Sequence, residues 1–299
     1  MEWIARLRAR CPEVEVRPEE PLARHVSFRI GGPAAVMAFP RTEEHLAALL
    51  RFARDEGVPA VILGAGTNVL PPDGGLDALV ICLLGGLDTL RLLEDGRIEA
   101  GAGVTLARCA SFACRMGLTG LEFAHGIPGS LGGGLYMNAG AYGGELCQVA
   151  AETTVMERDG TLKTFRGAAQ GFGYRRSAFQ EMDAVIVRAV LALSPGDREA
   201  IRAKMQDLAQ RRRASQPLNV PSAGSTFRRP QGGYAAALID QAGLKGLRVG
   251  GAVVSEKHAG FVVNDRGGTC ADVLTLIRQV QARVYERSGI RLEPEIRIL

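Results

Sequence analysis

The sequence predicts an α+β fold with many short strands over about residues 30–195. A strand, a helix and a second strand follow one another between Ala34 and Leu63, which is the order of a βαβ unit. Asp95-Gly96 and Asp159-Gly160 each separate two apolar runs, and Asp-Gly in that place is a strong signal for an antiparallel hairpin. The 299 residues are 46% hydrophobic, so the chain is long and apolar enough for two domains with cores.

The helices of this region are predicted from apolar spacing and from residues that favour helix ends. Trp3, Ile4 and Leu7 have helical spacing at the N-terminus. Thr42 and Thr105 can each cap a helix, and Gly57 and Gly117 can end them. The expected strands and hairpin arms, in order, are 34–39, 61–63, 78–83, 90–93 with 98–100, 153–157 with 161–165, and 183–193.

A boundary is expected near 194–197, where the sequence reads Ser-Pro-Gly-Asp. Beyond it, Ile201, Met205 and Leu208 predict a helix ending at Arg211-Arg-Arg213. The remaining expected elements are a helix at 234–241, strands near 249–254 and 260–263, a helix at 271–287 with a Thr269/Asp272 capping box and Gly289 at its end, and a last strand with Ile290, Leu292, Ile296 and Ile298 on one face.

Composition narrows the class of protein. A net charge of +4 is a weak basic excess that fits an acidic small molecule as well as a nucleic acid. The six cysteines include no Cys-x-x-Cys pair and are interpreted as buried free thiols, and the four scattered histidines suggest no metal site. The N-terminus lacks the apolar core of a signal peptide, and no run reaches the length of a membrane span. We therefore expect a cytoplasmic, soluble protein without a membrane partner.

Two glycine-rich segments are candidate ligand sites. Residues 121–145 interleave glycine with apolar residues, which indicates either main-chain N–H groups lining a phosphate or flat ring, or a tightly packed loop without a ligand. Gly64-Ala-Gly-Thr-Asn-Val69 begins like a dinucleotide fingerprint. Its sixth position is Val69 and Pro71-Pro72 follows, so no helix can start there and a Rossmann domain is rejected. A nest of N–H groups or a plain turn remain the alternatives.

Three polar residues could carry chemistry, although each has a simpler structural explanation. Arg175 stands beside Tyr174 and could grip a carboxylate, or form a surface salt bridge. Ser225 lies in a polar turn near Arg228, where a hydroxyl could give up a proton or merely bond the local backbone. Glu295 follows Glu293 on the polar face of the last strand, where a cross-strand ion pair is the simpler interpretation.

Taken together, the motifs resemble the UDP-N-acetylenolpyruvoylglucosamine reductase family, flavoenzymes that make UDP-N-acetylmuramate for peptidoglycan. They span nearly the whole chain, and their order makes the resemblance specific. The compact length resembles the shorter of the two types in the family. The matching segments are Ser27-Phe-Arg-Ile-Gly-Gly32, Leu63-Gly-Ala-Gly-Thr-Asn68, Gly126-Ile-Pro-Gly-Ser-Leu-Gly-Gly133, Asn138-Ala-Gly-Ala-Tyr-Gly143, Tyr174-Arg-Arg-Ser177, Pro221-Ser-Ala-Gly-Ser-Thr-Phe227, Ile239-Asp-Gln-Ala-Gly-Leu-Lys-Gly246 and Leu292-Glu-Pro-Glu-Ile-Arg297.

The resemblance implies a two-lobed FAD-binding domain of the vanillyl-alcohol-oxidase (PCMH) type at 1–195, with lobes at about 1–69 and 70–195. A smaller α+β substrate domain at 196–290 follows, and a C-terminal strand at 291–299 returns to the first lobe. It implies FAD and NADPH as cofactors. The implied cofactor-binding residues are Gly64, Ala65, Gly66, Thr67, Asn68, Val69, Gly126, Ile127, Pro128, Gly129, Ser130, Gly132, Gly133, Tyr136, Asn138 and Gly140, and the implied substrate-binding residues are Tyr142, Tyr174, Arg228, Gln241, Lys245 and Arg297.

The same resemblance assigns the chemistry. Hydride from the flavin adds to the vinyl carbon of an enolpyruvyl sugar nucleotide, Arg175 and Glu295 stabilise the resulting enolate, and Ser225 protonates it. The chain departs from the family at Arg228-Arg229-Pro230, where Lys-Asn-Pro or Arg-Asn-Pro is common. Another flavoprotein of the same cofactor fold would not explain the C-terminal motifs. A nucleic-acid binder built on Arg211–Arg213 would need more aromatic residues than the 5% present. We expect a monomer with a small-molecule substrate and no nucleic-acid partner.

Overall fold

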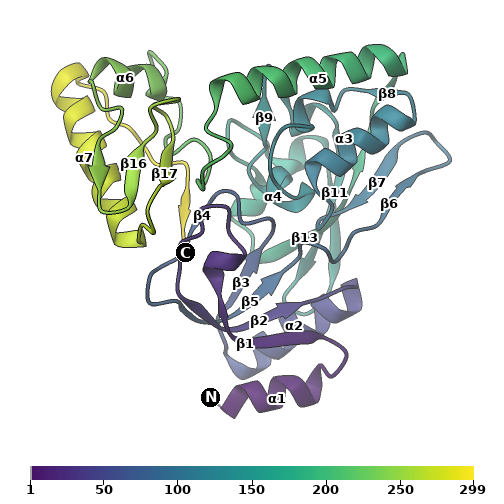
Figure 1. The fold of residues 1–299 in the computed structure, drawn as a ribbon. Helices are drawn as coiled ribbons and strands as arrows, with labels where there is room; N and C mark the ends of the chain where they lie inside the picture. The colour runs from purple at the N-terminus through teal and green to yellow at the C-terminus, as the bar shows by residue number, and fades with distance from the viewer. Residues whose placement is uncertain (1) are drawn as a thin grey trace. The chain divides into compact units, whose positions relative to one another are not determined.

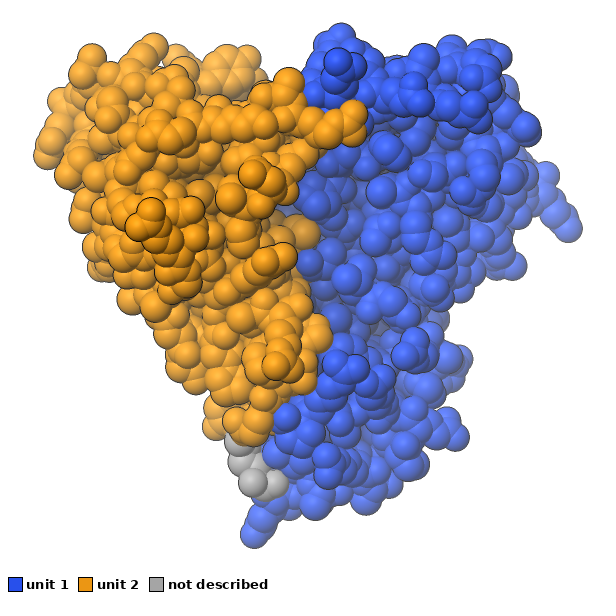
Figure 2. All heavy atoms as spheres, in the orientation of Figure 1, with its two compact units in different colours: residues 1–18, 36–65, 78–211 blue, residues 19–35, 66–77, 212–299 orange. Residues whose placement is uncertain are grey.

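The computed structural model describes residues 2–299, which form two compact units that each draw on three parts of the chain. Unit 1 comprises residues up to Pro18, Val36–Ala65 and Ala78–Arg211, and unit 2 comprises Glu19–Ala35, Gly66–Asp77 and Arg212–Leu299 (Figure 2). The division passes through three strands, β1 (Glu15–Pro21), β2 (Pro33–Phe39) and β5 (Leu76–Cys82). These strands and β3 (Ala60–Leu63) form a four-stranded sheet in the order β1-β2-β5-β3, in which β3 and β5 are parallel.

The helices of unit 1 begin and end where the capping residues predict. Thr42 Oγ1 accepts the His45 N–H at the start of α2 (Glu43–Glu56), and Gly57 ends the helix with a φ of 64°. Thr105 Oγ1 accepts the Arg108 N–H in the same way at the start of α3 (Leu106–Arg115). The other helices of unit 1 are α1 (Glu2–Arg10), α4 (Leu131–Tyr136) and α5 (Arg198–Ser215), which runs two residues past the predicted end and continues into unit 2.

Unit 1 also contains an antiparallel five-stranded sheet, with the order β12-β11-β13-β7-β6 (Figure 1). Its strands are β6 (Leu90–Leu92), β7 (Ile98–Gly101), β11 (Ala150–Glu157), β12 (Leu162–Arg166) and β13 (Ala184–Leu191). Both Asp-Gly hairpins are confirmed, and each loop has three residues. Glu157 N donates to Thr161 O, and Gly160 takes the left-handed conformation with a φ of 91°. A left-handed glycine after a type I turn closes a three-residue loop of this kind.

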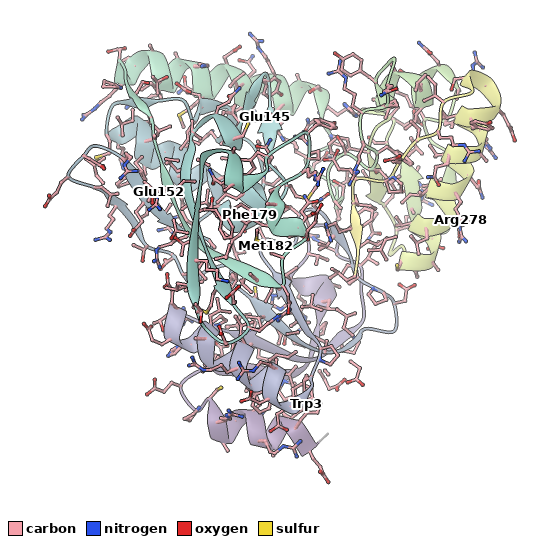
Figure 3. All side chains as sticks on the ribbon, turned by 180° about the vertical axis from the view of Figure 1, so that it is seen from behind. Trp3, Glu145, Glu152, Phe179, Met182 and Arg278 are labelled. Carbon is pink, nitrogen blue, oxygen red and sulfur yellow. The ribbon has the colours of Figure 1, made fainter. Side chains whose placement is uncertain are left out.

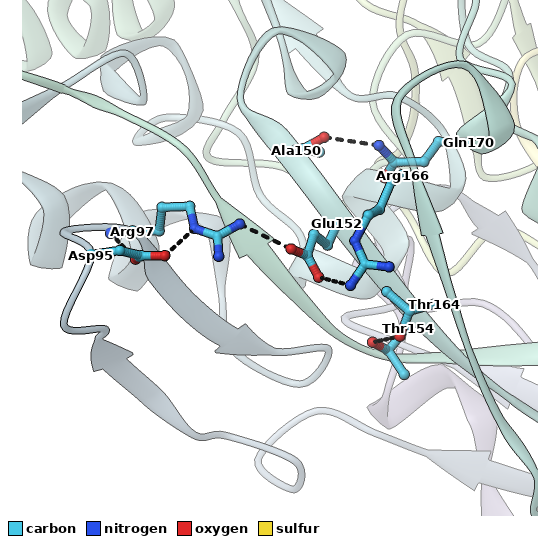
Figure 4. Close-up of polar contacts among 8 residues, drawn as sticks. All are labelled: Asp95, Arg97, Ala150, Glu152, Thr154, Thr164, Arg166 and Gln170. Atoms are coloured by element: carbon cyan, nitrogen blue, oxygen red, sulfur yellow. Dashed lines mark hydrogen bonds and ion pairs between the residues drawn. The ribbon is translucent and has the colours of Figure 1, made fainter.

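The edge of this sheet is tied by charged and polar side chains (Figure 4). Glu152 accepts Arg97 Nη1 at 2.9 Å and Arg166 Nη2 at 2.8 Å. The hydrogen bonds from Arg166, which has the larger effect, and from Arg97 hold the pKa of the Glu152 carboxyl below its usual range. Deeper in the sheet, Gln170 Nε2 donates to Ala150 O. Gln170 Oε1 accepts the buried Thr153 hydroxyl. These side-chain bonds therefore tie β11 to β12, to the β6–β7 hairpin and to the turn at 167–170.

Unit 2 contains the later helices and a three-stranded antiparallel sheet, β15-β16-β17. Its elements include α6 (Ala235–Gln241), α7 (Cys270–Ser288), β15 (Arg248–Val249), β16 (Ala252–Val254) and β17 (Val262–Asn264). The predicted capping box of α7 is present, because Thr269 and Asp272 bond each other's backbone N–H groups. Asp73 adds two further bonds to the same helix end, accepting the N–H groups of Cys270 and Ala271.

The predicted last strand is shorter than expected. Strand β18 covers only Arg297–Ile298 and pairs in parallel with β4 (Val69–Leu70). Leu292 and Ile296 are buried as predicted, whereas Ile298 is 54% exposed, so the expectation of one apolar face is wrong at that residue. Residues 293–295 pair instead with the segment around Phe227, in antiparallel fashion, and the chain pairs with β4 only from Arg297. The remaining short strands are β8 (Leu118–Thr119), β9 (Gly140–Ala141), β10 (Gly144–Glu145) and β14 (Ser194–Pro195).

Within the described residues, no helix combines the length and the apolar character needed to cross a bilayer. All six cysteines are free thiols, and five of them are buried, as expected from their apolar neighbours. Burial raises the pKa of the Cys109 thiol to about 12, so this thiol stays protonated and unreactive at neutral pH.

Candidate active site

The two predicted glycine segments meet within unit 1, at the start of α4. Ser130 is buried, and its hydroxyl accepts the Gly133 N–H as the N-cap of that helix. Gly64 lies directly against this cap: a Cβ atom at Gly64 would stand 2.4 Å from Ser130 Oγ. Glycine is therefore required at position 64 because the end of β3 approaches the cap too closely for any side chain. Residues 64–68 lead into β4 and not into a helix, which confirms the rejection of a Rossmann domain.

The glycines within residues 121–145 have two different roles. A Cβ at Gly132 would lie 2.9 Å from the Cβ of Ala102, and one at Gly134 would lie 2.8 Å from Leu146. Gly132 N also donates to Ala102 O, so this residue is packed on protein. Gly133 is different, because it is exposed and a Cβ there would meet only Ser130 Oγ, at 3.5 Å. Packing thus explains part of the segment, and the surface at Gly133 stays open to a ligand.

Arg175 lies at the tip of a tight turn in unit 1. Gly173 and Arg176 exchange backbone hydrogen bonds, so only Tyr174 and Arg175 form the loop between them. The guanidinium of Arg175 donates to the carbonyl oxygens of Asn138, at 3.5 Å, and Gly140, at 3.1 Å. It also lies over the ring of Tyr174, 5.0 Å from its centroid. The structure therefore brings Arg175 against the glycine-rich segment.

Ser225 and Glu295 are neighbours within unit 2. Glu295 N donates to Thr226 O at 2.8 Å, and Arg228 N donates to Glu293 O at 2.8 Å. These bonds pair the segment after Ser225 with the C-terminal segment in antiparallel fashion. The hydroxyl of Thr226 is buried and accepts the Val262 N–H, which holds the pair on β17. Ser225 itself is exposed, and Glu295 is half-buried.

Residues 66–69 of the segment Gly64–Val69 also belong to unit 2. Ser27 N donates to Gly66 O at 3.0 Å, and the Ser27 hydroxyl donates to Ser222 O at 2.6 Å. Asn68 Nδ2 reaches Glu295 O at 3.4 Å, and Asn68 O accepts the Arg297 N–H. Gly66 has a φ of 62°, and a Cβ there would lie 2.2 Å from His25 O. The candidate phosphate turn is therefore joined directly to the segments that carry Ser225 and Glu295.

The predicted substrate residues are mostly accessible. Tyr142 is 45% and Tyr174 is 51% exposed, and both lie in unit 1. In unit 2, Arg228 forms an ion pair with Glu293 at 3.8 Å, and Lys245 forms one with Asp240 at 2.8 Å. Gln241 and Arg297 are exposed in the same unit.

Four polar residues that position the site were not predicted as site residues. Ser27 and Ser177 belong to segments that match the family. Their hydroxyls donate to the carbonyl oxygens of Ser222 and Tyr136, and nothing in the neighbouring sequence indicates such a distant partner. Gln180 and Thr226 are likewise recognisable only from their bonds in the fold. His258 adds an electrostatic feature, since burial lowers the pKa of its imidazole while Nδ1 accepts the Gly260 N–H.

The donor set fits a flavin nucleotide. The turn at Gly64–Val69 has glycine at both close approaches, and the open surface at Gly133 allows a flat group to reach the backbone. The side chain of Asn138 is committed elsewhere, because Nδ2 donates to Glu145 Oε2 and to Gly173 O. Oδ1 accepts the Cys147 N–H, so any contact of Asn138 with a cofactor falls to its backbone.

Two known protein families match different parts of the chain. The family described as FAD binding domain matches residues 33–166. The family described as UDP-N-acetylenolpyruvoylglucosamine reductase, C-terminal domain, matches residues 216–299. The first match contains both glycine segments, and the second contains Ser225 and Glu295.

Similar proteins extend over almost the whole chain. A UDP-N-acetylenolpyruvoylglucosamine reductase of Limosilactobacillus reuteri is 44% identical over 99% of both chains, and one of Symbiobacterium thermophilum is 47% identical over 95% of this chain and 92% of its own. The crystal structure of the corresponding reductase from Thermus caldophilus is 34% identical, with a TM-score of 0.80 over 95% of this chain and 98% of its own. An alkyldihydroxyacetonephosphate synthase, 15% identical, shares the fold at a TM-score of 0.50 over 65% of this chain and 40% of its own. The predicted α+β fold with an FAD-binding domain is confirmed.

Proposed function

The chain belongs to the UDP-N-acetylenolpyruvoylglucosamine reductase family, and from this we propose that it reduces UDP-N-acetylenolpyruvoylglucosamine to UDP-N-acetylmuramate with NADPH, in peptidoglycan precursor synthesis. The observation that carries the proposal is 44% identity over 99% of both chains, which includes every segment of the candidate site. The family match at 216–299 argues against another oxidoreductase of the same cofactor fold.

FAD is the cofactor, and when bound it supplies the hydride, taken from NADPH, that reduces the vinyl group of the substrate. Gly64–Val69 would hold the pyrophosphate, and Gly126–Gly133 with Tyr136, Asn138 and Gly140 would hold the rest of the nucleotide. The close approach of Gly64 to Ser130 supports this, because it brings the start of Gly64–Val69 against the start of α4 within unit 1.

Three side chains act on the substrate in this proposal. Hydride addition to the vinyl carbon leaves negative charge on the carboxylate side, and Arg175 would stabilise it with its fixed fork of N–H donors. Glu295 would assist by hydrogen bonding. Ser225 would give its hydroxyl proton to the carbon next to the carboxylate, which completes the reduction. The backbone pairing of Glu295 with Thr226, one residue from Ser225, supports the joint action of the last two.

The remaining assignments follow from the same family. Residues 1–195 would form the FAD-binding domain, 196–290 the substrate domain, and 291–299 the returning strand, which the pairing of β18 with β4 supports. Tyr142, Tyr174, Arg228, Gln241, Lys245 and Arg297 would contact the sugar nucleotide. We also propose that the enzyme is monomeric, takes no nucleic-acid partner and works in the cytoplasm.

The role of Ser225 is tested by separating the two half-reactions in stopped flow. In Ser225→Ala, NADPH should bleach the flavin at the wild-type rate, whereas reoxidation by the enolpyruvyl substrate should collapse. Ser225→Cys is the matched control, because a thiol keeps a transferable proton and should restore part of the reoxidation rate. Normal reoxidation in Ser225→Ala would remove Ser225 from the mechanism.

A further inference from the structure

We propose that Asn138 and Gln180 are positioning residues that hold Arg175 in its working conformation. This inference rests on the proposed function, since it concerns the arginine assigned to stabilise the enolate. All the contacts that carry it lie within unit 1.

The turn that carries Arg175 needs outside support. Arg175 has a φ of 54°, in the left-handed region, at a turn position where glycine or asparagine is usual. A side chain in this region costs roughly 1–2 kcal/mol. Asn138 and Tyr142 also have positive φ values, 43° and 54°, so three of the six non-glycine residues with positive φ among the described residues fall in the two segments that meet here. Such strain persists only where surrounding contacts fix the backbone.

Asn138 fixes both the base of the turn and the guanidinium. Its Nδ2 donates to Gly173 O at 2.9 Å, the same carbonyl that closes the turn by accepting Arg176 N. Its own carbonyl accepts Arg175 Nη1. Asn138 is fully buried, and Glu145 Oε2 accepts its second amide hydrogen at 3.0 Å (Glu145 is labelled in Figure 3). Cys147 N donates to its Oδ1, so the carboxamide has one orientation.

Gln180 fixes the peptide of Arg175 itself. Its Nε2 donates to Arg175 O at 3.1 Å and to Tyr136 O at 2.7 Å, which uses both amide hydrogens. The Ser177 hydroxyl donates to the same Tyr136 carbonyl. Phe179, labelled in Figure 3, anchors the segment in the core, edge-on to Phe165 and Phe172. The loop of Arg175 is therefore clamped onto the end of α4.

The clamp has a consequence for the geometry of the reaction. Ser130 caps the start of helix α4 and lies against Gly64 of the segment Gly64–Val69. The helix ends at Tyr136, whose carbonyl oxygen accepts hydrogen bonds from the side chains of Gln180 and Ser177. One short helix thus sets the distance between the proposed flavin surface and the Arg175 turn. Because a misplacement of about 1 Å can cost about 100-fold in rate, loosening this clamp should slow the step that uses Arg175.

The test compares Gln180→Leu, which keeps the volume but removes both donors, with Arg176→Ala as the matched control. Arg176 is exposed in the same turn and pairs only with exposed Glu181 among the contacts described. In Gln180→Leu, FAD affinity and flavin reduction by NADPH should stay at wild-type values, while reoxidation by the enolpyruvyl substrate should slow about 10- to 100-fold. Arg176→Ala should leave both half-reactions unchanged. Asn138→Gly, which tolerates the positive φ but removes the carboxamide, should also slow reoxidation by the enolpyruvyl substrate.

Epistasis separates positioning from a general structural defect. If Gln180 acts through Arg175, then Arg175→Ala/Gln180→Leu should be no slower in reoxidation than Arg175→Ala alone. Multiplying effects, or unchanged reoxidation in both Gln180→Leu and Asn138→Gly, would overturn the inference while leaving the proposed function intact. A wild-type enzyme whose reduced flavin is not reoxidised by the substrate would instead overturn the proposed function, and the inference with it.

Discussion

Replacing Gly64 by alanine tests whether the two glycine segments meet as described. The new Cβ would lie 2.4 Å from Ser130 Oγ, and ordinary contact begins at 3.4 Å, so one of the two must move by 3.4 − 2.4 = 1.0 Å. The φ of Gly64 is not in the left-handed region, so the cost comes from this collision and not from the backbone. Overpacking costs about 1–3 kcal/mol. Displacing the Ser130 cap of α4 adds about 1 kcal/mol.

The expected total of about 2–4 kcal/mol can be measured by thermal and urea unfolding of the apoprotein, and for a chain of 299 residues it corresponds to a fall of roughly 3–6 °C in Tm. The FAD dissociation constant should rise as well, because the displaced cap lies in the proposed cradle. Gly64→Ala/Ser130→Ala is the diagnostic control. Without the hydroxyl, the nearest contact of the new Cβ is Ser130 Cβ at 3.7 Å, so the double variant should be more stable than Gly64→Ala. Wild-type stability in Gly64→Ala, or no recovery in the double variant, would refute the described contact.

Three further predictions use the same structure. In Gly133→Ala the new Cβ meets only Ser130 Oγ, at 3.5 Å, so the free energy of unfolding should be unchanged or higher. The FAD dissociation constant should rise, and an unchanged FAD affinity would count against a flavin at this surface. In Gln170→Leu the buried Thr153 hydroxyl and Ala150 carbonyl lose their partner, so urea unfolding should show a loss of about 1–3 kcal/mol. In Thr164→Val on the edge strand β12, the Thr154 hydroxyl loses its partner, but this pair is only partly buried, so the loss should be smaller. Burial depresses the pKa of His258 below 6.5, so its stabilising effect is complete above pH 6.5 and is lost as the pH falls through the folded-state pKa. Unfolding measured from pH 8 to pH 5 should show this loss, and His258→Asn, which keeps an acceptor for Gly260 N, should reduce it; an unchanged pH profile would contradict the assignment.

Local signals predicted the elements well because each depends on a few adjacent residues. Thr42, Thr105 and Thr269 all cap helices, and Gly57 and Gly289 end two of them in the left-handed conformation. The Asp-Gly pairs located both hairpins and the three-residue loop of the second, whereas the first loop is one residue shorter than the predicted arms left it, because Leu93 pairs with Arg97. The last strand was overextended because apolar alternation does not reveal that residues 293–295 pair with the segment at 226–228 and only Arg297–Ile298 with β4.

The assembly of the site could not be predicted from such local signals. Unit 2 depends on bonds between residues far apart in the chain, such as Ser27 with Ser222 and Asn264 with the carbonyl of Phe28. The polar partners of these bonds are ordinary in the sequence, and only the fold brings them together. The family resemblance identified Arg175, whereas its positive φ and its contacts with Asn138 and Gln180 required coordinates.

The stoichiometry of NADPH oxidation tests the central proposal most directly. Purified protein should carry the absorbance of FAD, and each mole of UDP-N-acetylenolpyruvoylglucosamine added under anaerobic conditions should oxidise one mole of NADPH and yield one mole of UDP-N-acetylmuramate. A protein that binds no flavin after reconstitution with FAD, or a bound flavin that NADPH reduces but this substrate does not reoxidise, would contradict the proposed function.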